Sequence, residues 1–437
     1  MKTIGSKSLL LLLLAALVGS SSAVKFNWFR TQHTPTVPEL ISENGYPVEI
    51  HTVVTIDGYI LEMHRIPHGI MNITSASSST HRPPVLLHHG LFSSSADFLM
   101  NDPQKALGYM LADAGYDVWL ANCRGNQYSR GHMTLNPDEE AEFWKFSWDQ
   151  IAIYDLATEI EYVLAVSESA RLSYVGYSMG TTVFFALLSE IPEYAVKVKV
   201  MAAMAPVAFM AHIEGLVKVL SHFSKEIDFF LNLMGVHEML PGGPDWDELV
   251  LKECGEPYSS RMKGCIGTLT PIVGGDLDEF QQEYLPEAFA QTPAGASKST
   301  LLHYAQLVLS KKFRKFDYGS FSQNLEHYGQ LTPTEYDLTK VRTPIALFVG
   351  LNDYLADRRD VDKLNSLLPN VIRYKFLNYP RYNHLDFIWG KHAAELVYVD
   401  IIGLFNKYNH INIKGQQQFF EEDVSYLKYP YNVSFHH

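Results

Sequence analysis

The sequence predicts an α/β fold in which a mostly parallel central sheet is flanked by helices and interrupted by a helical insertion. Short apolar runs typical of buried strands alternate with longer helix-like segments as far as Pro206, and the alternation resumes at Pro344. Parallel strands need crossover connections, so alternation at this spacing favours a sheet with helices on both faces. The stretch between these two prolines lacks strand signals and predicts the insertion.

The expected elements follow one another in a consistent order. The mature chain opens with a hairpin, because strand-like segments 46–51 and 59–66 flank Asp57-Gly58, a pair that adopts the positive φ of a tight turn. Further strands are expected at 84–88, 116–120, 172–175, 198–203, 344–350 and 371–376, and helices at 106–114, 148–166, 181–188 and 393–407. Several of these strands are apolar throughout, as in a parallel strand buried on both faces.

These elements divide the chain into five segments. We expect a signal peptide at 1–23, a core domain at 24–207 and 335–407, a helical cap or lid at 208–334, and a tail at 408–437 without clear periodicity. The cap is expected to be helical because apolar residues recur in it at helical spacing, namely Leu216, Val219, Leu220, Phe223, Ile227, Phe230 and Leu231.

The N-terminal segment has the order of a secretory signal peptide. Lys2 and Lys7 precede an apolar run from Leu9 to Val18, and small residues follow up to Ala23, after which we expect cleavage. The apolar run is about half of the roughly 20 residues that span a bilayer, which disfavours the alternative of an N-terminal membrane anchor. No later stretch predicts a transmembrane helix, so we expect a secreted or lysosomal protein.

Charge and composition restrict the class of protein and its possible partners. The formal net charge is −13 and the chain has no basic block, which argues against nucleic acid as a partner. Hydrophobic residues at 47% and charged residues at 19% are typical of a well-buried globular protein. The sequons that start at Asn72 and Asn432 are candidate glycosylation sites if they are exposed.

The chain has three cysteines, too few for a disulfide framework to hold the fold together. In an oxidising compartment Cys254 and Cys265 are close enough in sequence to close a short loop. Cys123 follows a strand-like run and is expected to be a buried free thiol. Three free thiols are the alternative.

Gly176-Tyr177-Ser178-Met179-Gly180 matches the G-x-S-x-G pattern and lies between an expected strand and an expected helix. In that context the motif indicates a sharp strand-to-helix turn that exposes the serine of an α/β-hydrolase. Side chains at either glycine would collide with neighbouring backbone. The helix N-terminus favours negative charge that develops at Ser178. An ordinary turn is the alternative.

A serine hydroxyl needs a base to accept its proton and an acid to orient that base. In α/β-hydrolases the order along the chain is serine, acid, histidine. Asp353 follows an expected strand by three residues and His384 follows the next, so both are expected beside Ser178. Asp357 and Asp386 are competing acids, but Asp357 begins an expected helix and Asp386 is very near the histidine in sequence.

The run His88-His89-Gly90-Leu91 ends an earlier strand, where an α/β-hydrolase loop supplies one backbone N–H to the oxyanion hole. The backbone N–H groups of Leu91 and Met179 are therefore the expected oxyanion donors. A zinc site at the paired histidines lacks further ligands at metal spacing, so we expect neither a metal nor a cofactor.

The chain resembles the animal acid lipase family, which contains gastric lipase, lysosomal acid lipase and insect relatives. Matching motifs extend over nearly the whole mature chain. They are Gly45-Tyr46-Pro47, Asp57-Gly58-Tyr59-Ile60-Leu61, Arg65-Ile66-Pro67, His89-Gly90-Leu91, Arg124-Gly125-Asn126, Tyr128-Ser129-Arg130, Phe143-Trp144-Lys145-Phe146-Ser147, Tyr154-Asp155-Leu156, Asn352-Asp353, Leu355-Ala356-Asp357 and Tyr382-Asn383-His384-Leu385-Asp386-Phe387.

The resemblance implies an α/β-hydrolase fold, hydrolysis of triacylglycerols or cholesteryl esters, a mobile lid, and a disulfide between Cys254 and Cys265. It also places nucleophile, acid and base on the residues expected from spacing. The family usually has histidine and glutamine around the serine, where this chain has Tyr177 and Met179, and glycine where it has Leu351. We interpret these departures as changes in the acyl pocket and the neighbouring loop, which affect the substrate more than the mechanism.

The predicted function is ester hydrolysis through an acyl-enzyme, with neutral lipid and the lipid–water interface as partners. The amphipathic run 212–234 would meet lipid with Phe223, Phe229 and Phe230, although packing of the cap on the core domain explains it equally well. Two alternatives are an esterase for small soluble esters and a lipid-carrying protein without catalysis. The sequence does not indicate an oligomeric state.

Overall fold

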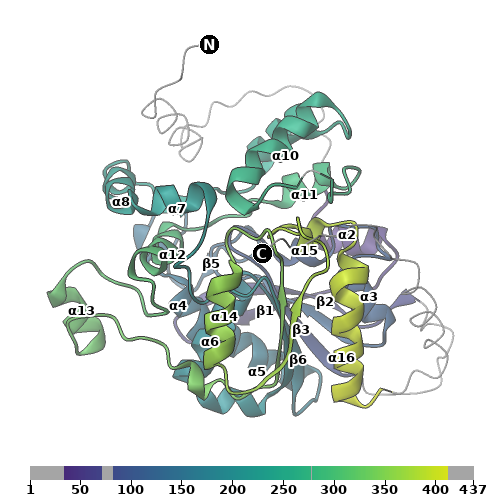
Figure 1. The fold of residues 1–437 in the computed structure, drawn as a ribbon, viewed down its shortest axis with the longest axis horizontal. Coiled ribbons are helices and arrows are strands. Elements are labelled where there is room, and N and C mark those ends of the chain that lie inside the picture. Colours follow the sequence, from purple (N-terminus) through teal and green to yellow (C-terminus); the bar gives the residue numbers. More distant parts are fainter. Residues whose placement is uncertain (1–33, 71–81, 277, 412–437) are drawn as a thin grey trace, which may run out of the picture.

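The computed structural model describes residues 34–70, 82–276 and 278–411 (Figure 1). The expected signal peptide at 1–23 and both sequons, at Asn72 and Asn432, lie outside the described residues. Most of the expected tail lies outside them as well. Among the residues described, no helix is both long enough and apolar enough to cross a bilayer.

A nine-stranded sheet forms the centre of the molecule, in the order β1-β2-β4-β3-β6-β7-β10-β11, with β5 beside β2. Antiparallel pairing joins β1 to β2, β2 to β4 and β2 to β5, and the other neighbours are parallel. The strands are β1 (Glu49–Val54), β2 (Tyr59–Ile66), β3 (Pro84–His88), β4 (Asp117–Leu120), β5 (Gly131–His132), β6 (Leu172–Tyr177), β7 (Val198–Met204), β10 (Ile345–Val349) and β11 (Val371–Phe376). The predicted mostly parallel sheet is confirmed.

Helices flank this sheet as the alternation predicts (Figure 1). They are α2 (Val37–Glu43), α3 (Leu107–Asp113), α4 (Trp148–Gln150), α5 (Ala157–Val166), α6 (Met179–Glu190), α14 (Arg358–Leu367), α15 (Asp386–Trp389) and α16 (Val399–Asn409). Two expected helices contain π-helical turns, at Ile151–Leu156 and at Ala394–Tyr398. Strands β3, β6 and β10 are buried along their whole length, which explains why their sequences lack polar alternation.

Between β7 and β10 the chain leaves the sheet and forms a mainly helical insertion. It contains α7 (Gly215–Ser221), α8 (Ser224–Leu233), α9 (Pro244–Cys254), α10 (Ser260–Val273), α11 (Leu285–Gln291), α12 (Lys298–Ser310) and α13 (Phe321–Tyr328). A short ribbon of β8 (Glu238–Met239) and β9 (Ala296–Ser297) also occurs, and strands this short leave no periodicity to detect. We propose 208–334 as the limits of this cap.

In Figure 1, α7, α8, α10 and α11 lie together above the sheet, whereas α13 lies at its side. A disulfide joins Cys254, at the end of α9, to Cys265 in α10, with the two sulfur atoms 2.00 Å apart. The pairing implied by the family resemblance is therefore present. Cys123 is a buried free thiol.

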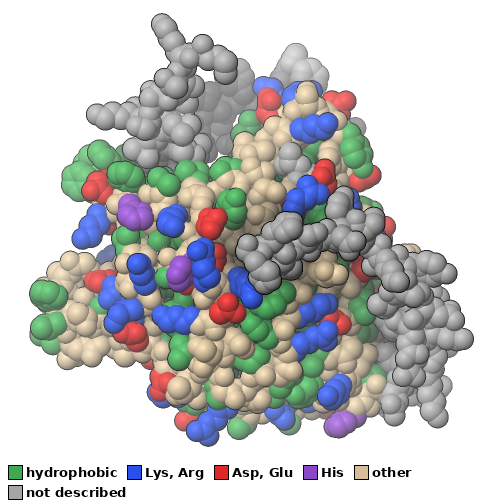
Figure 2. All heavy atoms as spheres, in the orientation of Figure 1, with side chains coloured by type: hydrophobic (Ala, Val, Ile, Leu, Met, Phe, Trp, Pro, Cys, Tyr) green, Lys and Arg blue, Asp and Glu red, His purple; other side chains and the backbone are tan. Residues whose placement is uncertain are grey.

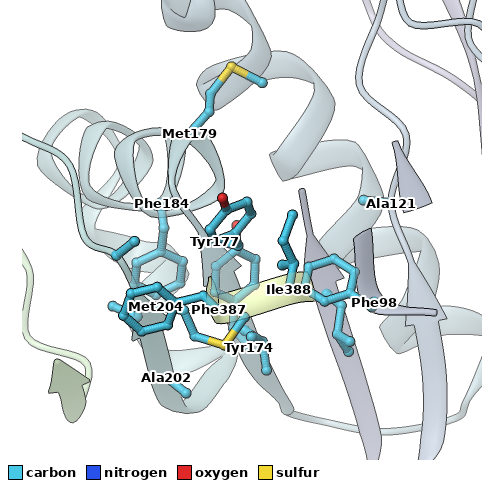
Figure 3. Packing of buried hydrophobic residues seen from close by; sticks show 14 of the residues in the cluster. Phe98, Ala121, Tyr174, Tyr177, Met179, Phe184, Ala202, Met204, Phe387 and Ile388 are labelled. Atoms are coloured by element: carbon cyan, nitrogen blue, oxygen red, sulfur yellow. The ribbon is translucent and has the colours of Figure 1, made fainter. Parts of the chain in front are cut away.

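Aromatic and aliphatic side chains fill the space beneath the carboxyl end of β6. Figure 3 shows Tyr174, Phe184, Met204 and Phe387 packed together, with the Met179 side chain pointing away from them. The rings of Tyr174 and Phe184 stack with centroids 4.7 Å apart. Each such buried ring stabilises the fold by about 1.5–3 kcal/mol relative to an exposed ring. The turn that follows β6 is therefore supported by a stable, well-packed cluster.

A buried arginine connects the turn of the first hairpin to the helical segment that contains Asp155. Arg124 donates from Nε to Asp155, at 2.6 Å, and from Nη1 to Asp57 in the hairpin turn, also at 2.6 Å. Its guanidinium carbon lies 3.8 Å from the centroid of the Tyr59 ring. Removing one partner of such a pair would leave an uncompensated buried charge, which costs about 3–5 kcal/mol.

A second buried polar pair joins β3 to α5. Glu159 of α5 and His88 are both fully buried, and the Glu159 carboxylate is 4.0 Å from His88 Nε2. Neither carboxyl oxygen of Glu159 has a hydrogen-bond partner among the described residues. Burial raises the pKa of Glu159 well above its usual range and lowers the pKa of His88 to about 3, so burial favours the neutral form of both groups.

We predict that Glu159→Gln stabilises the protein increasingly as pH rises. Above an unfolded-state pKa of about 4.3 and below the raised folded-state pKa, the unfolded chain releases the Glu159 proton whereas the folded chain keeps it. In that window the contribution of Glu159 to stability falls by up to roughly 1.4 kcal/mol per pH unit, whereas the contribution of His88 is the same in both proteins. Glutamine keeps the shape and removes this loss. Thermal melts at pH 4, 5.5 and 7 should show a Tm difference that grows with pH.

The exposed Glu193 supplies the matched control. Glu193→Gln should shift Tm by the same small amount at every pH. A Tm difference for Glu159→Gln that stays constant from pH 4 to pH 7 would contradict the assignment of a neutral buried carboxyl.

Candidate active site

Ser178 occupies a strained turn between β6 and α6. Its φ is 52° and its ψ is −112°, a conformation that non-glycine residues rarely adopt. Gly180 allows it, because a Cβ there would lie 2.1 Å from the carbonyl oxygen of His88. A Cβ on Gly176 would lie 2.7 Å from the backbone of Gly180. Both glycines of the motif are therefore required by close backbone packing, as the sequence predicts.

The structure brings Ser178, His384 and Asp353 together at the carboxyl ends of β6, β11 and β10. His384 Nε2 lies 2.8 Å from Ser178 Oγ, and His384 Nδ1 lies 2.9 Å from both carboxylate oxygens of Asp353. The carboxylate also accepts backbone N–H groups of Leu355 and Ala356, at 2.9 and 2.8 Å. These bonds hold the buried acid behind the imidazole ring, and they favour a proton on Nδ1.

The two competing acids are engaged elsewhere. Asp357 is the N-cap of α14 and accepts the backbone N–H of Arg359 at 2.8 Å. Asp386 accepts the backbone N–H of Asn383 at 2.6 Å, and burial raises its pKa well above the usual range. Neither carboxyl group forms a hydrogen bond with His384 among the described residues.

The residues that flank the serine differ in their surroundings. Tyr177 is buried, lines the cavity beside Ser178 and donates its hydroxyl to the carbonyl oxygen of His384 at 3.0 Å. The Met179 side chain is also buried but does not line the cavity. Of the three departures from the family pattern, Tyr177 therefore lines the cavity, whereas Met179 and Leu351 do not. Sequence reasoning missed the bond between Tyr177 and His384.

Backbone N–H groups of Leu91 and Met179 are available beside Ser178. Met179 is the first residue of α6, where an N–H has no partner within the helix. Leu91 follows Gly90, at which a Cβ would lie 3.4 Å from Ser178 Cβ. Within the described part of the chain no backbone carbonyl or side chain accepts either N–H. The two groups can therefore receive hydrogen-bond acceptors from a bound molecule.

A cavity of about 690 Å³ opens over the serine and the histidine. Its wall is mostly apolar and comes from both the core domain and the cap, including Phe92, Met210, Trp246, Leu269, Phe289 and Leu301. The disulfide between Cys254 and Cys265 forms part of the cap side, with Glu253 and Arg261 nearby. A cavity of this composition suits an apolar chain with a reactive carbonyl at one end.

The paired histidines before this loop are not arranged as metal ligands. His88 faces Glu159, whereas His89 Nε2 lies 3.0 Å from the sulfur of Cys123. Over residues 34–70, 82–276 and 278–411, no group of three histidine, cysteine or acidic side chains could hold a metal ion.

Family models and solved structures match this architecture. The partial alpha/beta-hydrolase lipase region matches residues 37–102, and the alpha/beta hydrolase fold matches residues 83–232. A solved structure from Sulfolobus solfataricus, of a protein assigned as a lipase, has a TM-score of 0.53 at 14% identity and covers 82% of this chain and 94% of its own. At that identity the likeness supports the fold alone, and the predicted α/β-hydrolase fold is confirmed.

Curated relatives are much more similar in sequence. Gastric triacylglycerol lipase of Bos taurus is 42% identical over 371 residues, covering 84% of this chain and 90% of its own length. Lipase member K of Homo sapiens is 36% identical over 399 residues, covering 91% and 97%. Lipase 3 of Drosophila melanogaster is 38% identical over 373 residues, covering 85% and 92%. This chain is therefore a serine ester hydrolase and belongs to the acid lipase family that includes gastric triacylglycerol lipase.

Proposed function

We propose that this lipase hydrolyses carboxylic esters of neutral lipids, triacylglycerols or cholesteryl esters, with Ser178 as nucleophile, His384 as base and Asp353 as acid. The observation that carries the proposal is the hydrogen-bonded chain of these three side chains at the floor of an apolar cavity of about 690 Å³. The printed name of the bovine relative, which specifies triacylglycerol, supports the substrate class.

The reaction has two acyl-transfer steps. His384 Nε2, 2.8 Å from the hydroxyl, accepts the Ser178 proton while the oxygen attacks the ester carbonyl. Asp353 stabilises the imidazolium that forms, and His384 then donates its proton to the departing alcohol. Water then donates a proton to His384 while its oxygen attacks the acyl carbon. The bond between that carbon and Ser178 Oγ breaks, His384 returns the proton to Ser178, and the fatty acid leaves.

Backbone N–H groups of Leu91 and Met179 are proposed to bind the oxyanion in both steps. Neither N–H group has an acceptor among the described residues, so no existing hydrogen bond has to break before the two groups bind the oxyanion. Loss of one such donor lowers kcat by roughly 10²–10³-fold in a serine hydrolase. The dipole of α6, which begins at Met179, adds to this stabilisation.

The cap presents an apolar surface that suits contact with a lipid–water interface. Figure 2 shows hydrophobic side chains gathered over α7 and α8. Exposed apolar residues on these helices and just after them are Val219, Phe223, Phe229, Phe230, Leu233 and Met234, and the exposed fraction reaches 73% at Leu233. Val217 of α7 lines the cavity, so this surface lies on the same element as the cavity wall.

We also propose that the protein acts outside the cytosol, either secreted or in lysosomes. The signal-peptide pattern of residues 1–23 supports export, and the disulfide between Cys254 and Cys265 suits an oxidising compartment.

Two variants test the catalytic roles. Ser178→Ala should lower kcat roughly 10⁴-fold or more on any ester, because no other group replaces the nucleophile. Asp353→Asn should lower kcat about 10³–10⁴-fold at pH 7, because the histidine loses its correct tautomer. Initial rates with p-nitrophenyl butyrate, a soluble ester, measure both effects.

Asp357→Asn is the matched control for the acid. Asparagine is also a good N-cap, so kcat should stay within about threefold of wild type. Loss of activity in Asp357→Asn together with full activity in Asp353→Asn would assign the acid to Asp357.

A third variant tests the lipid substrate. Phe229→Ser with Leu233→Ser should lower activity on emulsified long-chain triacylglycerol at least about tenfold, because each exposed side chain gains roughly 1.5–3 kcal/mol on entering lipid. Activity on p-nitrophenyl butyrate should change less than twofold. Emulsions of triolein and cholesteryl oleate measured from pH 4 to pH 8 also distinguish the two neutral lipid classes.

Helix α13 offers a matched control, since Phe321 and Leu325 are also exposed apolar residues one helical turn apart. Phe321→Ser with Leu325→Ser should leave both activities unchanged. If both double variants hydrolyse emulsified triacylglycerol as fast as wild type, and the rate does not rise when the substrate forms an interface, the soluble-ester esterase would be favoured.

A further inference from the structure

The loop that carries the Leu91 N–H is held by side chains on both sides of Gly90. One planar peptide unit contains both the Gly90 carbonyl and the Leu91 N–H, and in a trans peptide these two groups point in opposite directions. His89 Nδ1 lies 2.7 Å from the Gly90 carbonyl oxygen. A hydrogen bond from this ring therefore sets the direction in which the Leu91 N–H points.

The surroundings of His89 fix its proton on Nδ1. Its other ring nitrogen, Nε2, accepts the backbone N–H of Cys123 at 3.2 Å and the amide of Asn126 at 3.4 Å, and lies 3.0 Å from the Cys123 thiol. Burial lowers the pKa of His89 to about 4, so the ring carries a single proton above that pH. With Nε2 occupied by donors, that proton remains on Nδ1.

The preceding peptide unit is held by Asp97, which lies in a short 3₁₀ helix, Ser95–Phe98. Its Oδ2 accepts the Gly90 N–H at 3.1 Å, and its Oδ1 accepts the Ser93 hydroxyl. Asp97 is 1% exposed and forms part of the cavity wall. Together with His89, it fixes both peptide units that meet at Gly90.

This loop packs directly on the nucleophile turn, so a displacement would be transmitted to the reacting atoms. A Cβ at Gly90 would lie 3.0 Å from the Tyr177 ring and 3.4 Å from Ser178 Cβ. A misplacement of about 1 Å can lower the rate of an enzyme by roughly 10²-fold. The Leu91 N–H needs the same accuracy relative to the oxyanion.

We propose that Asp97 is a positioning residue for ester hydrolysis, because its carboxyl group, opposite His89, holds the Gly90 peptide so that the Leu91 N–H faces the oxyanion. The neutral form serves best, because a carboxylate at this place in the cavity wall would oppose the negative charge that develops on the oxyanion. This inference rests on the proposed roles of Ser178 and Leu91.

Charge on Asp97 depends on groups around it. Burial raises its pKa to about 6, against the lowering effect of its bonds to Ser93 and Gly90 and of His384. Tyr177 and Tyr398 lie near the Asp97 carboxyl. The elements packed against its 3₁₀ helix carry the titratable residues His88, Glu287 and Asp386, and His64 Nδ1 lies 2.8 Å from Ser95 Oγ of that helix. As pH rises through about 6, Asp97 becomes charged and opposes the negative charge of the oxyanion.

The test compares Asp97→Ala and Asp97→Asn with wild type on p-nitrophenyl butyrate at pH 5 to 8. Alanine removes the acceptor, so kcat should fall roughly 10–100-fold, part of the loss of a whole oxyanion donor, with KM within about threefold. Asparagine keeps an oxygen for the Gly90 N–H and cannot ionise. At pH 5 its kcat should lie within about threefold of wild type, and the ratio of asparagine to wild-type kcat should rise severalfold by pH 8.

Asp102→Ala is the matched control, since Asp102 accepts the backbone N–H of Gln104 and has no bond to the Gly90 loop. Its kcat should equal that of wild type. A kcat for Asp97→Ala within twofold of wild type would overturn the proposal. A ratio of Asp97→Asn kcat to wild-type kcat that does not change with pH would also overturn it. If the alanine variant does not fold, the asparagine variant is sufficient for the test.

Labelling with an active-serine phosphonate separates failure of this inference from failure of the proposed function. Wild type should be labelled at Ser178, and Asp97→Ala should be labelled more slowly by the same factor as its loss of kcat. Wild-type protein that is labelled no faster than Ser178→Ala would refute the proposed function itself. Equal labelling of wild type and Asp97→Ala would refute only the role of Asp97.

Discussion

The structure depends on one steric constraint, the close approach of the backbone around Ser178. A positive φ at a serine persists only where the surroundings leave no alternative. Here the carbonyl of His88 at the end of β3 lies against Gly180, and the backbone of Gly180 lies against Gly176. Because β3 and β6 are neighbours in the sheet, the strained serine and the loop that begins after His88 are positioned by the same contact.

Polar groups beneath this turn are kept neutral by burial, and neutrality lets them act as fixed donors and acceptors. Burial favours the neutral forms of His88 and Glu159, and the His89 ring holds its proton on one defined nitrogen. Charged groups at these places would compete with the charges that develop during catalysis. Arg124 is fully paired, so its charge is balanced by two aspartates. In the proposed mechanism the ion pair that forms during the reaction is the one between Asp353 and the imidazolium.

Sequence reasoning identified the residues whose position follows from strand order, and it missed those whose partners are distant in the chain. Ser178, Asp353 and His384 each follow a strand of one parallel sheet, so the order of strands predicts that they meet. The bond between Tyr177 and His384 joins residues 207 positions apart, and no local pattern marks it. Asp97 was not singled out because an aspartate in a polar loop resembles an ordinary turn residue until its burial is known.

Features common to all α/β-hydrolases do not decide the substrate, because an esterase for soluble esters would share the proposed triad and both proposed oxyanion donors. We propose that the cap is the part of the molecule that distinguishes the two functions. Its inner side completes an apolar cavity, and its outer side exposes aromatic and aliphatic residues on α7 and α8, as a surface that binds a partner or a membrane does. Lys298 holds α8 against α12 through Asp228, at 2.8 Å, and Asn232. With one face held by polar bonds, the apolar face of α8 is turned outward, which is the arrangement that binding to a lipid surface requires.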